Sequence, residues 1–267
     1  MILIHSSGGH KAMERLRSAL SCALTLCLIV SASVARASQK CCEETSVLDI
    51  TIQGLKLDNV TVEEALIALL DRNRSRLLIG FEAVPHAPEG ESKTISLQID
   101  SATVGEILSR LCQADPRYEF KAVTSQLINV YPKGRASDPF GLMDMKIRDF
   151  VFRGKAFPHT LAWTINKLAP ELREFLDAKA KEWAKKAGPR GGSPGSLLAG
   201  NATPPEIEMD LNDVTVRGIL NAVALCSRKL YLEGRLQGLE PIGWKYEFII
   251  DPNAPTGLGG YPRWGDF

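Results

Sequence analysis

The sequence has little of what a metal, redox or nucleic-acid site requires. Of its four histidines, His5 and His10 lie near the N-terminus, and His86 and His159 stand alone without a second ligand at metal-binding spacing. None of its six cysteines forms a C-x-x-C pair. Its 32 Lys and Arg residues nearly balance its 31 Asp and Glu residues, so its charge does not match nucleic acid. We therefore expect no metal, no cofactor and no nucleic-acid partner.

Long apolar runs are also scarce. One such run covers residues 19–34, and no later stretch is long or apolar enough to cross a membrane. Basic residues at positions 11, 15 and 17 precede this run, and Ala35-Arg36-Ala37 follows it as an A-x-A cleavage site. This order predicts a signal peptide over residues 1–37 that is cut before Ser38. The mature protein is then periplasmic or secreted.

Two alternatives for the N-terminus stay open. The uncleaved run could anchor the protein in a membrane, although it is shorter than the roughly 20 apolar residues that span a bilayer. A start at Met13 would give a more ordinary signal peptide. Cleavage changes the net charge from +1 to −2 and leaves four cysteines, and the sequence does not decide the redox state of Cys41, Cys42 and Cys226. Cys112 falls at a core position of a predicted helix, which favours a buried side chain over a reactive thiol.

A ten-residue sequence motif occurs three times and identifies the repeating structural unit. Its copies are LDNVTVEEAL at 57–66, IDSATVGEIL at 99–108 and LNDVTVRGIL at 211–220. Each copy is a strand end followed by a helix whose apolar residues recur at i, i+3, i+4, i+7 and i+8, on one helical face. The three sets are Val62, Ala65, Leu66, Leu69 and Leu70; Val104, Ile107, Leu108, Leu111 and Cys112; and Val216, Ile219, Leu220, Val223 and Ala224.

The Thr of each copy has the place of a helix N-cap. Thr61 with Glu64 and Thr103 with Glu106 have the spacing of a capping box, in which each side chain binds the other residue's backbone N–H. Thr215 keeps the cap, but Gly218 stands where the acid would be. We therefore assign these residues a structural role and no catalytic one.

A fourth, degenerate copy at 152–161 lies 95 positions after the first. It predicts a helical stripe of Phe157, Thr160, Leu161, Thr164 and Ile165. The preceding strands also match at this offset, including a shared slip in apolar alternation after Ile52 and after Ile147, which predicts a shared bulge or bend. The chain is therefore expected to be a tandem pair of double repeats.

These patterns predict an α+β fold of two tandem βαβ-βαββ domains, each with two helices packed between small sheets. Domain 1 covers 46–133, a linker covers 134–141, and domain 2 covers 142–252 with an insertion at 166–206. In domain 2 we expect a charged helix over 171–186 and a closing hairpin made by 230–232 and 244–250. The tail, 253–267, is expected to be flexible. Its aromatic residues are candidate partner-binding side chains: Tyr261, Trp264 and Phe267.

The first unit resembles the short domain at the N-termini of secretins and of some TonB-dependent receptors. The matching residues are 57–70, 95–111 and 127–132, and domain 2 resembles a diverged second copy. The resemblance implies two helices between a three-stranded and a two-stranded sheet. It also implies contacts with envelope proteins through exposed strand edges. Neither a secretin pore domain nor a receptor barrel follows in this sequence, so pore formation and transport are not carried over.

We found one formal match to a catalytic motif. Residues 191–195 fit G-x-S-x-G but lie in a Gly/Pro-rich stretch rather than in the strand-to-helix turn that a nucleophile needs. The sequence thus favours a non-enzymatic, exported module that binds or scaffolds envelope proteins, with self-association as an option. The alternatives are an accessory subunit of a secretin or TonB-linked system, an extracytoplasmic hydrolase with a site near 166–206, and a small-ligand carrier. The partner, the oligomeric state and the free strand edge stay open.

Overall fold

Strand-to-helix units follow one another along the chain in the computed structural model, which describes residues 46–86, 93–134, 138–187, 203–250 and 260–267. The first half holds η1 (Val47–Asp49), β1 (Thr51–Val60), α2 (Val62–Asp71), β2 (Leu78–Glu82), β3 (Ile95–Thr103), α3 (Val104–Ala114), β4 (Tyr118–Ala122) and β5 (Leu127–Pro132). The second half holds η2 (Leu142–Asp144), β6 (Lys146–Lys155), α4 (Pro158–Leu168), α5 (Pro170–Ala187), β7 (Glu206–Thr215), α6 (Val216–Leu232), β8 (Trp244–Ile250) and β9 (Gly260–Asp266). The expected α+β class is confirmed.

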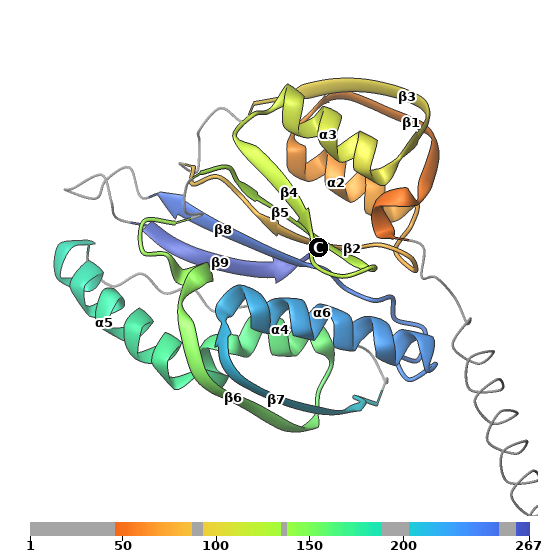
Figure 1. Cartoon of the computed structure of the whole chain (residues 1–267). Coiled ribbons are helices and arrows are strands. Elements are labelled where there is room, and N and C mark those ends of the chain that lie inside the picture. The colour runs from red at the N-terminus through yellow and green to blue at the C-terminus, as the bar shows by residue number, and fades with distance from the viewer. Residues whose placement is uncertain (1–45, 87–92, 135–137, 188–202, 251–259) are drawn as a thin grey trace, which may run out of the picture. The chain divides into compact units, whose positions relative to one another are not determined.

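The elements stack in five layers around a central sheet of order β4-β5-β2-β8-β9 (Figure 1). Helices α2 and α3 lie between this sheet and the antiparallel pair β1-β3, and helices α4 and α6 lie between it and the antiparallel pair β6-β7 (Figure 1). Each helical layer has its own apolar core. Ile79 and Phe81 of β2 belong to the first core, whereas Leu78 belongs to the second. The central sheet is therefore buried on both faces along β2.

One sheet joins the two halves, which differs from the predicted pair of separate domains. Strand β2 of the first half pairs in parallel with β8 of the second, with Gly80 opposite Trp244 and Glu82 opposite Tyr246. The predicted linker also packs where the structure describes it. The Asp138 carboxylate is 2% exposed and accepts hydrogen bonds from the backbone N–H groups of Phe140 and Leu142. The two halves form one sheet because the backbone of β2 pairs with the backbone of β8.

Two glycines allow this close pairing. A Cβ atom on Gly80 would overlap the Trp244 ring and lie 2.6 Å from Asn129 Oδ1. A Cβ atom on Gly243 would overlap the backbone carbonyl oxygen of Ile79. The seam between β2 and β8 therefore requires glycine within β2 and directly before β8, since a side chain would push the two strands apart.

The three well-matched copies of the ten-residue motif each form the predicted strand end and capped helix. Thr61 with Glu64 and Thr103 with Glu106 make complete capping boxes. The Thr215 hydroxyl accepts the Gly218 N–H at 3.0 Å without an acid at that position. The predicted stripes are buried, with Cys112 half-buried at the end of its stripe.

The shared slip in strand alternation is confirmed as a bend. Ile52, Leu55 and Leu57 are buried in β1, and Ile147 and Phe150 are buried at the matching positions of β6. The β1-β3 register does not change at this slip, and Gly54 there has φ of 62°. In β1 a backbone turn at glycine, rather than an extra residue, therefore shifts the buried face, whereas β6 makes the same shift with Asp149 at the position that matches Gly54.

The fourth copy is displaced by one residue, so its predicted stripe is wrong in part. Helix α4 begins at Pro158 with Phe157 as N-cap, and no side chain caps it. Thr160 is exposed, whereas the buried positions are Pro158, Leu161, Ala162, Ile165 and Ala169. Proline favours the first helical position because its fixed φ suits the helix and its missing N–H needs no partner. The helix therefore starts one position later than the repeat predicts.

The C-terminal region departs furthest from the prediction. Residues 230–232 end α6 instead of forming a strand, because the helical period continues past the predicted core stripe. The hairpin partner of β8 is β9, which pairs with it antiparallel from Trp244 opposite Asp266 to Ile250 opposite Gly260. The tail is therefore not flexible over residues 260–266, while 251–259 lie outside the described residues. The predicted charged helix is confirmed by α5.

The predicted signal peptide, its cleavage site, Cys41 and Cys42 lie outside the described residues, as does the G-x-S-x-G match. In the described part of the chain no helix is long and apolar enough to cross a membrane.

Candidate functional site

Strand β4 forms one outer edge of the central sheet. The Lys133 N–H donates to the Arg117 carbonyl at 2.7 Å, and the Val123 N–H donates to the Leu127 carbonyl at 2.8 Å. Antiparallel hydrogen bonding alternates, so Glu119 and Lys121 also bond inward to β5. The backbone groups of Phe120 and Ala122 consequently point away from the sheet. We call this outward side of β4 the β4 edge.

The opposite edge of the sheet is protected. Gly243 donates to the Phe267 carbonyl at 3.1 Å, so the odd-numbered residues of β9 bond inward to β8. Pro262 then falls at an outward-facing position, where it offers no N–H to an added strand. Natural sheets block their edges in this way against unwanted pairing. The β4 edge has no proline and no residue with positive φ between Tyr118 and Ala122.

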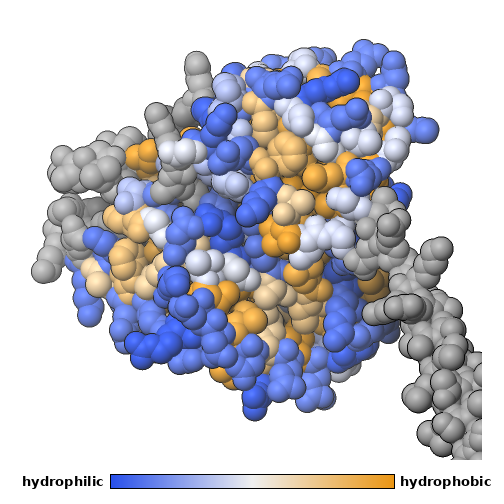
Figure 2. Space-filling model, in the orientation of Figure 1, coloured by the Kyte–Doolittle hydropathy of each residue, from blue (hydrophilic) through white to orange (hydrophobic). Residues whose placement is uncertain are grey.

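A hollow of about 510 Å³ lies beside this edge. We call it the Arg217 hollow; its lining includes Glu119, Lys121, Val123, Asn129, Tyr131, Asp144 and Arg217. Glu119, Lys121 and Val123 share the face of β4 that looks toward α6. Val123 is 40% exposed, and Figure 2 shows apolar surface in the region where Figure 1 places β4.

Arg217 lines the side of this hollow that faces the sheet. It lies in the first turn of α6 and forms ion pairs with Glu82 of β2, which is 1% exposed at its side chain, and with Asp144 of η2. Its guanidinium carbon lies 5.9 Å from the centre of the Tyr131 ring. Burial opposes the Arg217 charge, but the hydrogen bonds and charges of Glu82 and Asp144 outweigh burial and raise its pKa. Arg217 is therefore a permanent cation that ties the two halves together.

A second, smaller hollow of about 120 Å³ lies near the turn before β4, and most of its charged lining residues form ion pairs. Arg117 binds the buried Asp115 carboxylate through two nitrogens, at 2.8 and 2.6 Å. Burial acts to raise the pKa of Asp115, and the Arg117 hydrogen bonds overcome it and lower that pKa. Lys245 pairs with both Glu63 and Glu247. The Lys245 pairs join β8 to α2, so these charged groups hold the structure together.

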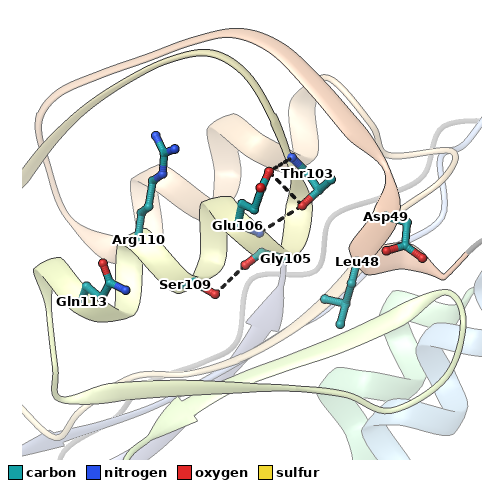
Figure 3. A pocket seen from close by; sticks show the side chains of 8 residues that line it. All are labelled: Leu48, Asp49, Thr103, Gly105, Glu106, Ser109, Arg110 and Gln113. Atoms are coloured by element: carbon teal, nitrogen blue, oxygen red, sulfur yellow. Dashed lines mark hydrogen bonds between the residues drawn. The ribbon is translucent and has the colours of Figure 1, made fainter.

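A third hollow, of about 460 Å³, opens beside the start of α3 (Figure 3). The Glu106 carboxylate in it turns back to Thr103, as Figure 3 shows, and accepts the Thr103 backbone N–H at 2.8 Å. This backbone hydrogen bond, followed by the hydroxyl of Thr103, lowers the pKa of Glu106. The carboxylate is thus occupied by capping, as the sequence predicted.

The three candidate aromatic side chains of the tail do not gather into one exposed site. Phe267 is 7% exposed, and its ring centre lies 5.4 Å from that of Phe81 in the first core. Trp264 is partly buried with its ring centre 4.7 Å from that of Tyr246. Tyr261 lies within β9, and its side chain is outside the described set. The prediction of Phe267 as a partner-binding side chain is therefore corrected: it is a core residue.

The hydrolase alternative placed a site near 166–206. The three hollows above contain no residue of this segment. Within the described ranges no group of three or more His, Cys, Asp or Glu residues is placed to hold a metal ion.

Both described cysteines are free and half-buried. Burial, followed by the charges of Asp115 and Glu119, raises the pKa of the Cys112 thiol to about 11, and burial also raises the pKa of Cys226.

Because the thiolate is the reactive form, Cys112 should react with iodoacetamide at pH 8 about a hundredfold more slowly than a thiol of ordinary pKa. Timed alkylation followed by mass spectrometry of the peptide measures this rate, with the denatured chain as control. Equal rates in both states would contradict the burial described.

The sequence could not single out the β4 edge or Arg217. Both depend on which strands become neighbours in the central sheet, and that pairing joins residues far apart in the chain.

Comparisons with models of protein families, with curated proteins and with solved structures found no match to this chain.

Proposed function

We propose that this protein is an exported, non-enzymatic module that binds or scaffolds other proteins of the cell envelope, and that it does so by adding a strand to the β4 edge. The observation that carries the proposal is the contrast between the two edges of one sheet. Pro262 blocks the β9 edge, whereas Phe120 and Ala122 offer outward backbone groups on β4. An added strand gains affinity from main-chain hydrogen bonds and specificity from pockets for alternate side chains.

The Arg217 hollow supports this proposal because it lies along the same edge. Side chains of a bound strand that face α6 would meet Tyr131, Lys121 and the stem of Arg217. In the smaller hollow Arg117 and Lys245 hold the carboxylates of Asp115 and Glu63, which favours binding over catalysis because a catalytic acid or base must exchange a proton with its substrate.

Photo-crosslinking in the native envelope tests the proposal. A photoreactive residue at Lys121 should form adducts with a protein partner, either another envelope protein or a second copy of this chain, and one at Val151, which is 49% exposed on β6, should not. Ala122→Pro removes an outward N–H from the edge and should abolish the adducts, while Ala122→Val keeps that N–H and should retain them. Circular dichroism confirms that each variant is folded. The absence of adducts from Lys121, or equal adducts from Val151, would refute edge binding.

A further inference from the structure

We propose that a second copy of this chain fits the β4 edge, antiparallel, with Phe120 facing Phe120 of the other copy. This inference rests on the proposed use of the β4 edge for protein binding. The backbone direction and the charges of β4 both suit a second copy as the occupant of that edge.

The backbone pattern suits this register. Phe120 and Ala122 point their N–H and C=O groups outward, and Tyr118 points its carbonyl outward while its N–H donates to the Asp115 carbonyl at 3.2 Å. Around a two-fold axis at Phe120, the two Phe120 residues exchange hydrogen bonds, and Ala122 of each copy donates to Tyr118 of the other. The paired residues are hydrogen-bonded pairs, as an antiparallel ladder requires.

The charges suit the same register. Glu119 then lies opposite Lys121 of the other copy, and Lys121 opposite Glu119, so two ion pairs form on the face toward α6. These are non-hydrogen-bonded pairs, in which side chains approach most closely. Within the part of the chain that the structure describes, neither Glu119 nor Lys121 forms a salt bridge. Both are thus available to a partner.

The same charges exclude the neighbouring registers. A slip that keeps the outward backbone groups paired would set Glu119 against Glu119 or Lys121 against Lys121. Like charges directly opposite one another destabilise a strand pair. The sequence Glu119-Phe120-Lys121 therefore specifies one register, which is what a self-pairing strand needs.

The other face of β4 would extend an existing core. Phe120 packs against the apolar core of the first half and is partly exposed. In the paired state the two Phe120 rings are cross-strand neighbours, and aromatic pairs of this kind stabilise sheets. The strand is short, so the dimer should be concentration-dependent rather than permanent.

Charge reversal tests the register directly. Glu119→Lys gives two lysines on the paired face, and Lys121→Glu gives two glutamates, so each variant alone should dimerise at least about tenfold more weakly than the natural chain. An equimolar mixture should recover dimerisation, because each Lys then faces a Glu. Sedimentation equilibrium over a concentration series measures the dissociation constants. Lys146→Glu, an exposed change on β6, is the control and should leave dimerisation unchanged.

Three results would overturn the inference: a natural chain that stays monomeric across the series, a dimer indifferent to both reversals, or a mixture that does not recover. If either variant fails to fold, hydrogen exchange of the natural chain decides. The Phe120 and Ala122 amides should exchange more slowly as concentration rises, and unchanged exchange refutes the pairing. A monomer that still crosslinks from Lys121 to another envelope protein would refute self-pairing and leave the proposed function standing.

Discussion

Deleting residues 260–267 should lower the free energy of unfolding by more than about 4 kcal/mol. The deletion removes β9, which pairs with β8 over its whole length, and withdraws the Phe267 ring from the first core. Emptying the site of one buried Phe alone costs about 3–5 kcal/mol. Because small domains are stable by only about 5–15 kcal/mol, a large fraction of the shortened chain should be unfolded at moderate temperature.

Thermal and urea unfolding followed by circular dichroism measure this loss. Gly265→Ala is the matched control within the same strand, since an added Cβ there meets no atom within 4 Å. It should change stability by no more than about 0.5 kcal/mol. A shortened chain that unfolds at the same temperature and urea concentration as the natural one would show that β9 and Phe267 do not hold the sheet.

Replacing Arg217 with methionine should cost about 3 kcal/mol of stability. The change leaves the Glu82 carboxylate, with its side chain 1% exposed, without its cation. Breaking a buried pair by removing one partner costs about 3–5 kcal/mol, and the lower end applies because Arg217 is 25% exposed. The Arg217 contacts with Glu82 and Asp144 join β2 of the first half to α6 and η2 of the second. The substitution should therefore weaken the packing of the two halves against each other.

A double variant separates charge burial from packing. Arg217→Met with Glu82→Leu removes both charges and should recover most of the lost stability, because an apolar pair of similar size can replace a buried ion pair. Lys146→Met breaks an exposed ion pair with Asp213 and should cost less than about 1 kcal/mol. Urea unfolding of the four proteins gives the comparison. A double variant as unstable as the single one would show that Arg217 acts through its packing.

Local structure was accessible from the sequence because local residues determine it. Thr61 with Glu64 and Thr103 with Glu106 cap their helices through contacts three positions apart, and the apolar period fixes each buried face. The strand bend near Gly54 followed from the same kind of spacing. Where the local signal was misread, as at α4, the cause was also local: Pro158 sets the helix start more strongly than the repeat offset does.

The merged sheet was not accessible in the same way, although a signal for it existed. All five residues of β2 are buried, and the stretch Leu78-Ile79-Gly80-Phe81 is continuously apolar or small instead of alternating. Such a run indicates a strand covered on both faces. It does not say which other strand lies beside it, because β8 is more than 160 positions later in the chain. The β4 edge became identifiable only once that order of strands was known.

The parallel pairing of β2 with β8 also constrains the order of folding. Synthesis runs from the N-terminus to the C-terminus, so β2 is made long before β8 and β9 can cover its side. Until then the first half exposes an unpaired inner strand and an open site for the Phe267 ring. Contacts between such distant positions slow folding, because the intervening chain must be ordered first. Phe267, which is made after all the other residues of the first core, therefore completes that core, and the two halves should fold as one cooperative unit.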